Sequence, residues 1–331
     1  MSKKKARIVG TGSYLPKKVL TNQDLEKIVN TSDEWIVTRT GMRERRVAAE
    51  DEYTSHMGAA AARKALESAS KSIDEIDMIL VATSTPDYMF PSTAALIGHQ
   101  LGGKNIPAFD LQAACTGFLY ALSLSKGYIE GGIYKNILVI ASEKLSAFTN
   151  YKDRGTCVLF GDGAAAAVVS DEGAGLVVHD VCLGADGEQE DLLIIRGGGS
   201  RNPTSKETVE KDMHFIEMEG REVFKHAVRR MESAAQECLD RVQMKEKELD
   251  WVVPHQANER IISFLAKRFG MPSEKVYRTV HKYGNTSASG VVIALDELLH
   301  THEVKEKENI LLVAFGAGFT WGATILTKEN A

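Results

Sequence analysis

The sequence predicts an α/β fold made of two similar halves that pack face to face, with a site between them. Three observations lead to this prediction. Short apolar runs alternate with amphipathic helical patterns along the chain. Segments of the first half recur in the second half at one constant offset. A polar, glycine-containing stretch at residues 170–175 marks a joint near the middle.

The expected strands are short runs of apolar residues, and helical patterns separate them. The runs that we assign to strands span residues 77–83, 108–114, 136–142, 164–170, 251–255 and 309–315. The clearest helical patterns span residues 55–69, 116–132 and 259–270. This alternation is typical of a sheet with helices on its faces.

The internal similarity indicates a duplication. Three pairs of matching residues, in the runs DMIL/DWVV, NILV/NILL and CTGFLYAL/ASGVVIAL, are each 173 positions apart: Asp77 and Asp250, Asn136 and Asn309, Gly117 and Gly290. One match would carry little weight, but three at one offset imply a repeated unit of about half the chain. We therefore expect two domains, residues 1–172 and residues 173–331.

The composition excludes several classes of protein. Of 331 residues, 44% are hydrophobic and 26% are charged, as in globular domains, and the net charge of −5 argues against wholesale nucleic-acid binding. Residues 1–12 are basic but lack the apolar core of a signal peptide, and no run approaches the ~20 apolar residues of a membrane helix. Four cysteines without metal-ligand spacing indicate a reduced, cytoplasmic protein with no metal site.

One of these cysteines, Cys115, stands where an expected strand passes into an expected helix. The unpaired amides at a helix N-terminus favour the thiolate, which is the nucleophilic form. A buried cysteine also acts as a small hydrophobic residue, so an inert thiol remains open from this stretch alone. The repeat has Ala288 at the matching position, so the fold itself does not require sulfur there. We expect Cys157, Cys182 and Cys238 to be packing residues.

Two polar residues of the second half strengthen the nucleophile interpretation. His255 follows a strand, and Asn285 lies in a turn before the helix that matches the Cys115 helix. Alone, His255 would be a satisfied core residue and Asn285 a turn former. If the halves are related by approximate two-fold symmetry, both residues meet Cys115 at facing helix starts. The glycine-rich bend AFGAGFTWG could then supply the backbone N–H groups of an oxyanion hole.

Together with its other motifs, this arrangement resembles the β-ketoacyl-acyl-carrier-protein synthase III family. The motifs that carry the resemblance run nearly end to end: GTGSYLP, TSDEWIVTRTGMRERR, FPSTAALIG, AACTGF, DRGT, FGDGAAA, VPHQANERII, HKYGNTSA and AFGAGFTWG. The resemblance implies a thiolase-like fold, with two mixed sheets in a layered α-β-α-β-α core. It implies condensation of an acyl-CoA primer, most often acetyl-CoA, with malonyl-acyl carrier protein, releasing CO2 and initiating fatty-acid synthesis. It also implies a cytoplasmic homodimer that needs no cofactor, because acyl-CoA is a substrate.

The resemblance assigns roles to individual residues. Cys115 would hold the acyl group, His255 and Asn285 would stabilise the enolate formed by decarboxylation, and the amides of Cys115 and Ala317 would bind the oxyanion. Many relatives have Gly where this chain has Ala317. The group that binds the oxyanion is a backbone N–H, which Ala supplies as well as Gly if the backbone dihedral angles at this position suit Ala. The implied CoA-binding residues are Thr31, Trp35, Arg39, Arg154 and Asn258, with Trp35 and Arg154 enclosing the adenine.

The resemblance also implies an acyl pocket and a surface for the acidic carrier protein. The pocket would be lined by Leu145, Phe160 and Leu193, and closed by Phe90 from the partner subunit. The docking surface would be formed by Lys225, Arg260, Lys267 and Arg268, the last three on one face of a helix. Without the resemblance, TSDEWIVTRT would read as a surface helix with a packed Trp, and the basic face as a solvated one.

Other classes of protein share part of this pattern. A thiolase would need a second cysteine near the C-terminus, and an elongating ketosynthase would need His in place of Asn285. A hydrolase with Cys, His and Asn in this chain order would need a thiolate–imidazolium pair. A catalytically inactive dimeric binding protein is disfavoured by the presence of all three residues. Condensing enzymes of secondary metabolism share the fold and remain the main alternative.

Overall fold

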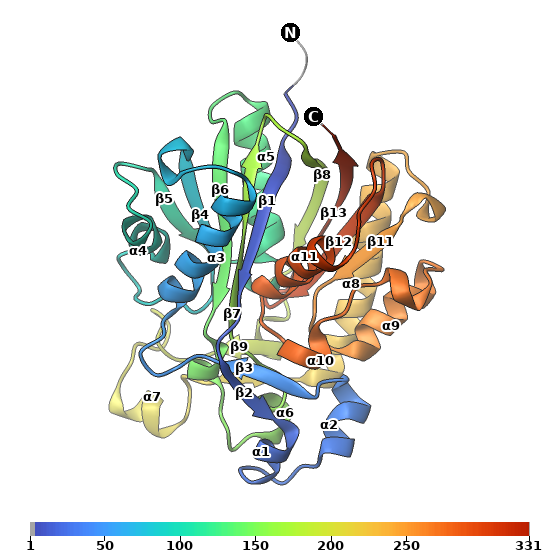
Figure 1. Cartoon of the computed structure of the whole chain (residues 1–331). Helices are drawn as coiled ribbons and strands as arrows, with labels where there is room; N and C mark the ends of the chain where they lie inside the picture. The colour runs from blue at the N-terminus through green and yellow to red at the C-terminus, as the bar shows by residue number, and fades with distance from the viewer. Residues whose placement is uncertain (1–3, 331) are drawn as a thin grey trace.

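The computed structural model describes residues 4–330, which form a central sheet with helices on both sides (Figure 1). The strands are β1 (Arg7–Tyr14), β2 (Lys18–Thr21), β3 (Glu44–Val47), β4 (Met78–Ala82), β5 (Ala108–Leu111), β6 (Asn136–Glu143), β7 (Gly163–Ser170), β8 (Gly175–Ala185), β9 (Leu193–Ile195), β10 (Ile216–Met218), β11 (Trp251–Pro254), β12 (Asn309–Gly316) and β13 (Thr320–Glu329).

The α-helices are α1 (Asn22–Glu26), α2 (Asp33–Thr40), α3 (Thr54–Ser68), α4 (Thr93–Gln100), α5 (Gly117–Glu130), α6 (Arg154–Cys157), α7 (Lys206–Glu210), α8 (Gly220–Arg241), α9 (Glu259–Arg268), α10 (Val280–Tyr283) and α11 (Ser289–Thr301). Short 3-10 turns connect several of them, among them η2 (Ala114–Thr116). In the described range, no helix is both long and apolar enough to cross a bilayer.

The main sheet has nine strands in the order β11-β12-β13-β8-β1-β7-β6-β4-β5. The two halves of the sheet share one arrangement: β4 and β6 are parallel, as are β11 and β12, and each pair is followed by two antiparallel neighbours. The first half has one more strand, β5, at its edge, parallel to β4. The halves join where β1 pairs with β8, at two residue pairs only. The mixed sheets expected from the sequence are therefore continuous through this short seam, and the expected division at 172/173 falls in the turn between β7 and β8.

The 173-residue offset extends to the strand register. Ile79 pairs with Leu138 in the first half, and Val252 pairs with Leu311, their counterparts, in the second. The matching aspartates explain why their motifs recur: Asp77 accepts a hydrogen bond from the Asn136 backbone N–H at 2.9 Å, and Asp250 accepts one from Asn309 at 2.8 Å. Each aspartate thereby fixes the start of two neighbouring strands.

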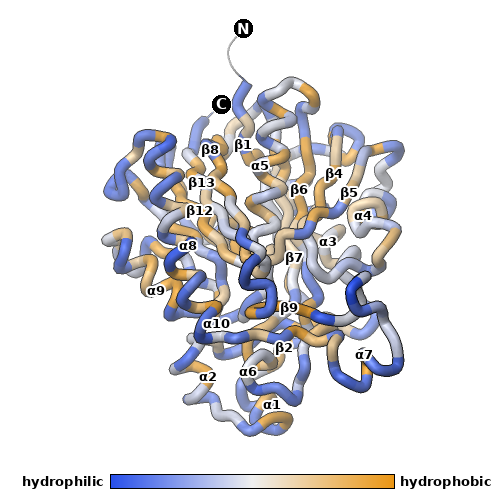
Figure 2. Tube along the Cα trace, turned by 180° about the vertical axis from the view of Figure 1, so that it is seen from behind, coloured by the Kyte–Doolittle hydropathy of each residue, from blue (hydrophilic) through white to orange (hydrophobic). Residues whose placement is uncertain are grey.

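Three apolar clusters define the helical and sheet layers. One contains the inner helices α5 and α11 and the sheet faces that enclose them, including Phe118, Leu122, Val291 and Leu295. A second lies between α3, α4 and the outer face of the first half-sheet, and a third lies under α8 and α9 against the second. Figure 2 shows the apolar colour concentrated along the central strands and α5. The result is the expected α-β-α-β-α order, with α5 and α11 starting at the centre of the molecule.

Candidate active site

Cys115 lies at a sharp turn between β5 and α5. The strand ends at Leu111, three residues earlier than the sequence predicted, because the chain must turn through Ala114, whose φ is 45°. This left-handed conformation is uncommon for a residue with a Cβ atom. Cys115 follows in η2, directly before the first turn of α5, and its side chain is 7% exposed.

The same turn occurs in the second half. Ser287, which matches Ala114, has φ 51°, and Ala288, which matches Cys115, precedes α11. The two helix starts face one another, since a Cβ added to Gly117 would lie 3.4 Å from the Cβ of Ala288. The left-handed turn therefore belongs to the repeated frame, whereas the sulfur is specific to the first half, as the sequence predicted.

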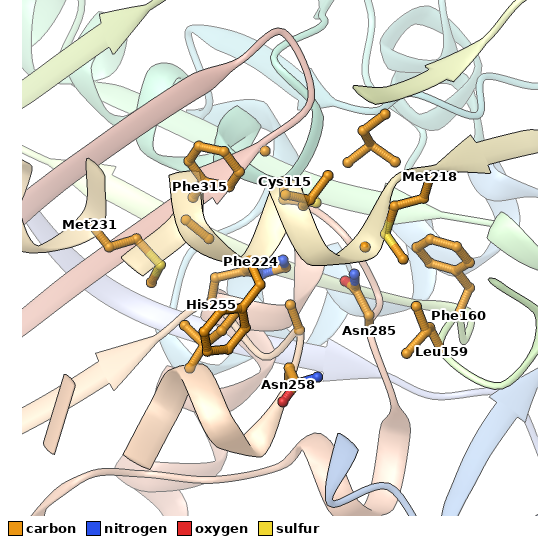
Figure 3. Close-up of a pocket in the computed structure, with 17 residues that line it drawn as sticks. Cys115, Leu159, Phe160, Met218, Phe224, Met231, His255, Asn258, Asn285 and Phe315 are labelled. Carbon is orange, nitrogen blue, oxygen red and sulfur yellow. The ribbon is translucent and has the colours of Figure 1, made fainter. Parts of the chain in front are cut away.

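Cys115, His255 and Asn285 line one narrow cavity of about 110 Å³ (Figure 3). The remaining wall is mostly apolar and comes from β10, α8, β12, the loop before β7 and the start of α9. Its residues include Leu159, Phe160, Met218, Val223, Phe224, Met231, Asn258 and Phe315. The close-up shows the three polar side chains coming from different parts of the chain toward the same space. The structure thus brings together the three residues that the sequence singled out.

A second cavity of about 430 Å³ also has Cys115 in its wall. Its apolar lining includes Leu145, Phe160 and Leu193, the three residues predicted to form an acyl pocket, together with Ile194, Ile195 and Ile216. Cys115 therefore lies where a narrow cavity meets a wider apolar one.

His255 is a neutral imidazole at physiological pH. It follows β11, is 3% exposed, and burial lowers its pKa to about 4. Its Nδ1 atom is buried without a hydrogen-bond partner, near Gly290 at the start of α11. A neutral imidazole still carries one N–H, so His255 can donate a hydrogen bond without bringing a charge into the cavity.

The Asn285 side chain is oriented by the backbone of its own turn. Its Oδ1 accepts a hydrogen bond from the Ser287 N–H at 2.9 Å. Because the carbonyl oxygen of the amide is held in this way, the amide nitrogen with its two N–H groups is the part left to face a ligand. Asn285 therefore also offers donors to the cavity.

The Cys115 thiol is protonated in this site. Burial raises its pKa to about 12, the carboxylate of Glu143 raises it as well, and a hydrogen bond with Ser287 lowers it. Desolvation is the largest of these contributions. Neutral thiol and neutral imidazole do not form the thiolate–imidazolium pair that a cysteine hydrolase needs.

Glu143 is a site residue that the sequence reasoning missed. It ends β6, is fully buried, and burial raises its pKa to about 7. Its carboxylate accepts hydrogen bonds from the hydroxyls of Thr85 and Ser287 at 2.7 and 3.0 Å, and from the Ser84 N–H at 3.1 Å. A carboxylate at the end of a mostly apolar strand was the signal in the sequence, because acidic residues are seldom fully buried without a reason.

Gly316 gives the nucleophile its space. A Cβ atom at this position would lie 2.7 Å from the backbone nitrogen of Cys115, which is closer than real contacts allow. Ala317 follows it in the wall of the wider cavity and is not among the residues with left-handed backbone. The dihedral condition for Ala at this position is met.

The residues expected to bind CoA cluster around α2 and the start of α9. The guanidinium carbon of Arg154 lies 4.7 Å from the Trp35 ring centroid, and that of Arg39 lies 5.0 Å away. A base between Trp35 and Arg154 would need about 7 Å, two van der Waals contacts, so Arg154 must move to admit one. The Thr31 hydroxyl is buried without a partner. Asn258 caps α9 through the Arg260 N–H and also donates to the Arg39 carbonyl.

The structure separates the four predicted docking residues. All four are exposed, and Arg260 stacks on Phe224 in the wall of the narrow cavity, 5.0 Å from the ring centroid. Lys225 donates to Glu222 at 2.7 Å. Arg268 is held by Glu232 and Glu246 at 2.5 and 3.0 Å, so its charge is already balanced. Phe90 is 86% exposed and lines neither cavity of its own chain.

Comparisons with known proteins point to one family. The family model for 3-oxoacyl-[acyl-carrier-protein] synthase III matches residues 109–187, and the model for its C-terminal part matches residues 239–328. The chain is 60% identical over 325 residues to a β-ketoacyl-[acyl-carrier-protein] synthase III of Chlamydia muridarum, covering 98% of this chain and 99% of that protein. A protein of the same name from Caldanaerobacter subterraneus is 51% identical, with 97% of each chain covered. The crystal structure of the 3-oxoacyl-[acyl-carrier-protein] synthase III from Aquifex aeolicus superposes with a TM-score of 0.90 at 47% identity, covering 97% of this chain and 99% of that one.

Proposed function

Because the chain belongs to the β-ketoacyl-[acyl-carrier-protein] synthase III family, it is a condensing acyltransferase, and we propose that its reaction is divided between the two cavities that meet at Cys115. The reaction is the initiating condensation of fatty-acid synthesis. An acyl-CoA primer, acetyl-CoA in our proposal, combines with malonyl-acyl carrier protein to give 3-oxoacyl-acyl carrier protein, CoA and CO2. The observation that carries the proposal is the position of Cys115 between a narrow entrance with polar donors and a wider apolar chamber.

In the first half-reaction, Cys115 Sγ attacks the primer thioester and keeps the acyl group, while CoA leaves. The acyl chain then occupies the apolar cavity beside Leu145, Phe160 and Leu193. The negative charge on the carbonyl oxygen is stabilised by backbone N–H groups, for which the amides of Cys115 and Ala317 are our candidates. No cofactor is needed, since the thioester supplies the activated acyl group.

In the second half-reaction, the malonyl thioester enters the narrow cavity and loses CO2. Negative charge develops on its thioester oxygen, where hydrogen-bond donors lower the energy of the enolate. Neutral His255 supplies one N–H and Asn285 supplies the amide N–H groups that its fixed Oδ1 leaves free. The enolate carbon then attacks the acyl carbon on Cys115, and the thiolate leaves.

The substrates reach the narrow cavity past α2 and α9. We assign the CoA nucleotide to the surface formed by Thr31, Trp35, Arg39, Arg154 and Asn258. For the acidic carrier protein we assign chiefly Arg260 and Lys267, since charge complementarity mainly guides the encounter of two proteins. Lys225 contributes less, because Glu222 already pairs with it. Arg268 contributes less than the sequence predicted, because two glutamates already hold it.

We further propose that the enzyme is a cytoplasmic homodimer. Tyr88, Met89 and Phe90 are 61%, 81% and 86% exposed, which is unusual for three consecutive large apolar side chains and favours a covered surface. A second copy would cover them and bring Phe90 to the partner's acyl pocket. All four cysteines are free, as is usual in a reducing compartment.

Intact-mass measurement with acetyl-CoA tests the proposal. We expect the enzyme to gain one acetyl group, and Cys115→Ala to gain none. Cys157→Ala serves as the control, because it changes another buried cysteine, on α6, outside both cavities. A thioester-labile acetyl group on Cys115→Ala would refute the assignment, and a product formed without malonyl-acyl carrier protein would refute the reaction.

A further inference from the structure

The two amides assigned to the oxyanion belong to turns from different halves of the chain. Cys115 lies in η2, and Ala317 lies between β12 and β13. Both residues line the wider cavity. Across residues 4–330, neither N–H donates to another backbone carbonyl. Both donors are therefore left for a ligand, and they can act on one oxygen atom only if the distance between the two turns is fixed.

The two turns touch, yet over the described range they share no backbone hydrogen bond. A Cβ atom at Gly316 would lie 2.7 Å from the Cys115 nitrogen, so the two backbones are in contact. In that same range, the hydrogen bonds that cross this contact all involve the hydroxyl of Thr320. Thr320 is the first residue of β13 and follows the Ala317 turn directly.

The Thr320 hydroxyl has partners in both turns. Its Oγ1 lies 3.1 Å from the Ala113 carbonyl oxygen and 2.8 Å from the Thr116 Oγ1, both in the first turn. It also lies 3.1 Å from the Ala317 carbonyl oxygen in the second turn. Two hydroxyl oxygens 2.8 Å apart need a proton between them, so at least one hydrogen bond joins the two turns.

These contacts act on the backbone around both donors. The Ala113 carbonyl also accepts the Thr116 N–H at 3.1 Å, which closes the turn that contains Cys115. The Ala317 carbonyl belongs to the residue that carries the second donor, so a hydrogen bond to it restrains the backbone of that residue. Thr116, which forms the other side of the link, is fully buried and cannot exchange its partners for water. One hydroxyl thereby limits the relative movement of the two amides.

We propose that Thr320 is a positioning residue that holds the Cys115 and Ala317 amides at the separation an oxyanion requires, an inference that rests on the proposed acyl transfer to Cys115. As the thiol attacks the thioester, negative charge collects on the former carbonyl oxygen. Two N–H groups that already converge stabilise this charge without having to reorganise. Without the Thr320 hydroxyl both amides remain, but the distance between them varies. Acyl transfer then becomes slower, although no catalytic group has been removed.

The test uses the whole enzyme and its Thr320→Val variant, which loses the hydroxyl and keeps a branched side chain of similar size. Mass spectrometry measures two rates: single-turnover acetylation of Cys115 by acetyl-CoA, and alkylation of Cys115 by iodoacetamide. Iodoacetamide reacts by displacement at a saturated carbon, so it needs the thiol but no oxyanion hole. We expect acetylation to slow by about 10- to 100-fold, as for a donor that is displaced and not removed. Alkylation should stay within a few fold of the parent rate.

The vibrational frequency of the acyl-enzyme carbonyl provides a second measurement. With carbonyl-labelled acetyl-CoA, infrared difference spectra report the C=O stretch of the thioester on Cys115. This frequency falls as hydrogen bonds to the carbonyl oxygen strengthen. We therefore expect a higher frequency in Thr320→Val than in the parent, and the parent frequency in Thr320→Ser, which restores the hydroxyl. A role in stability alone would leave the frequency of the folded acyl-enzyme unchanged.

Thr324→Val is the matched control. Thr324 is fully buried on the same strand, and its hydroxyl donates to the Asp180 carbonyl at 3.1 Å, outside both cavities. This variant should lose stability but keep the parent acetylation rate and carbonyl frequency.

The role of Thr320 alone is overturned if the parent is acetylated and Thr320→Val matches it in acetylation rate or in carbonyl frequency. An equal slowing of acetylation and alkylation would also overturn it, because the thiol itself would then be displaced. A parent enzyme that is alkylated but not acetylated at Cys115 would refute the proposed function, and the role of Thr320 with it.

Discussion

Replacing Asn285 by Ala should separate the two half-reactions. Acyl transfer uses the thiol and backbone amides, whereas decarboxylation uses the Asn285 amide N–H groups. The loss of one such donor costs about 100- to 1,000-fold in rate, or about 2.7 to 4 kcal/mol of transition-state stabilisation. We expect CO2 release from malonyl-acyl carrier protein to fall by that factor, while acetylation of Cys115 stays within a few fold of the parent rate.

The structure adds a second effect to this substitution. Asn285 Oδ1 accepts the Ser287 N–H, and the alanine variant leaves that buried amide without a partner. An unsatisfied buried donor costs about 1 to 3 kcal/mol, so the alanine variant should also unfold more easily. Asn285→Asp retains an acceptor oxygen but loses the donors, so it should decarboxylate slowly and keep more of its stability.

Single-turnover acetylation, CO2 release and thermal unfolding of both variants provide the comparison. An alanine variant that loses acetylation as severely as decarboxylation would show that Asn285 supports the nucleophile. An aspartate variant that decarboxylates at the parent rate would show that the amide N–H groups do not stabilise the enolate.

Three further substitutions test other parts of the site. Gly316→Ala should cost about 1 to 3 kcal/mol of stability and displace Cys115, because the added Cβ would lie 2.7 Å from the Cys115 nitrogen. Thermal unfolding and the rate of acetylation measure these two effects. Gly127→Ala on α5 is the control and should be neutral or stabilising, because nothing lies within 4 Å of its added Cβ. Arg154→Ala should raise the KM for acetyl-CoA and leave the KM for acetyl-pantetheine unchanged, as measured by steady-state kinetics. An equal rise in both KM values would show that Arg154 does not bind the nucleotide. Arg260→Glu should lower kcat/KM for malonyl-acyl carrier protein at low salt and leave acetylation unchanged. The fall in kcat/KM should be larger than for Arg268→Glu, and the opposite order would contradict the assigned surface.

Much of the site could be inferred because the sequence repeats itself. The offset placed Cys115 opposite Ala288 and brought Asn285 to the same point, and the structure shows the two helix starts facing each other. The ionisation of the thiol could not be inferred in this way. The degree of burial and the nearby Glu143 depend on how distant segments pack, and both raise the thiol pKa.

The same limit applies to the surface and to the edges of elements. Arg268 lies on the basic face of α9 as its spacing predicted, yet its partners Glu232 and Glu246 come from 36 and 22 residues away, beyond any local pattern. The strand before Cys115 ends early because Ala114 adopts a left-handed conformation, which is not predictable from an alanine in the sequence. Long-range packing thus decided what local preference left open.

The repeat offset also relates Glu143 to Gly316 and His255 to Ala82. In the first half, the end of β6 carries the carboxylate that reaches Ser287, whereas in the second half the end of β12 carries no side chain beside Cys115. Two copies of one backbone have therefore diverged into complementary roles. The first half holds the acyl group on Cys115, and the second half supplies hydrogen-bond donors and the Ser287 hydroxyl. A cysteine introduced at Ala288 would find Ala82 where Cys115 has His255 opposite, so the ancestral symmetry cannot be restored by one substitution. The duplication gave this chain a single asymmetric reaction chamber, and neither half could perform the chemistry by itself.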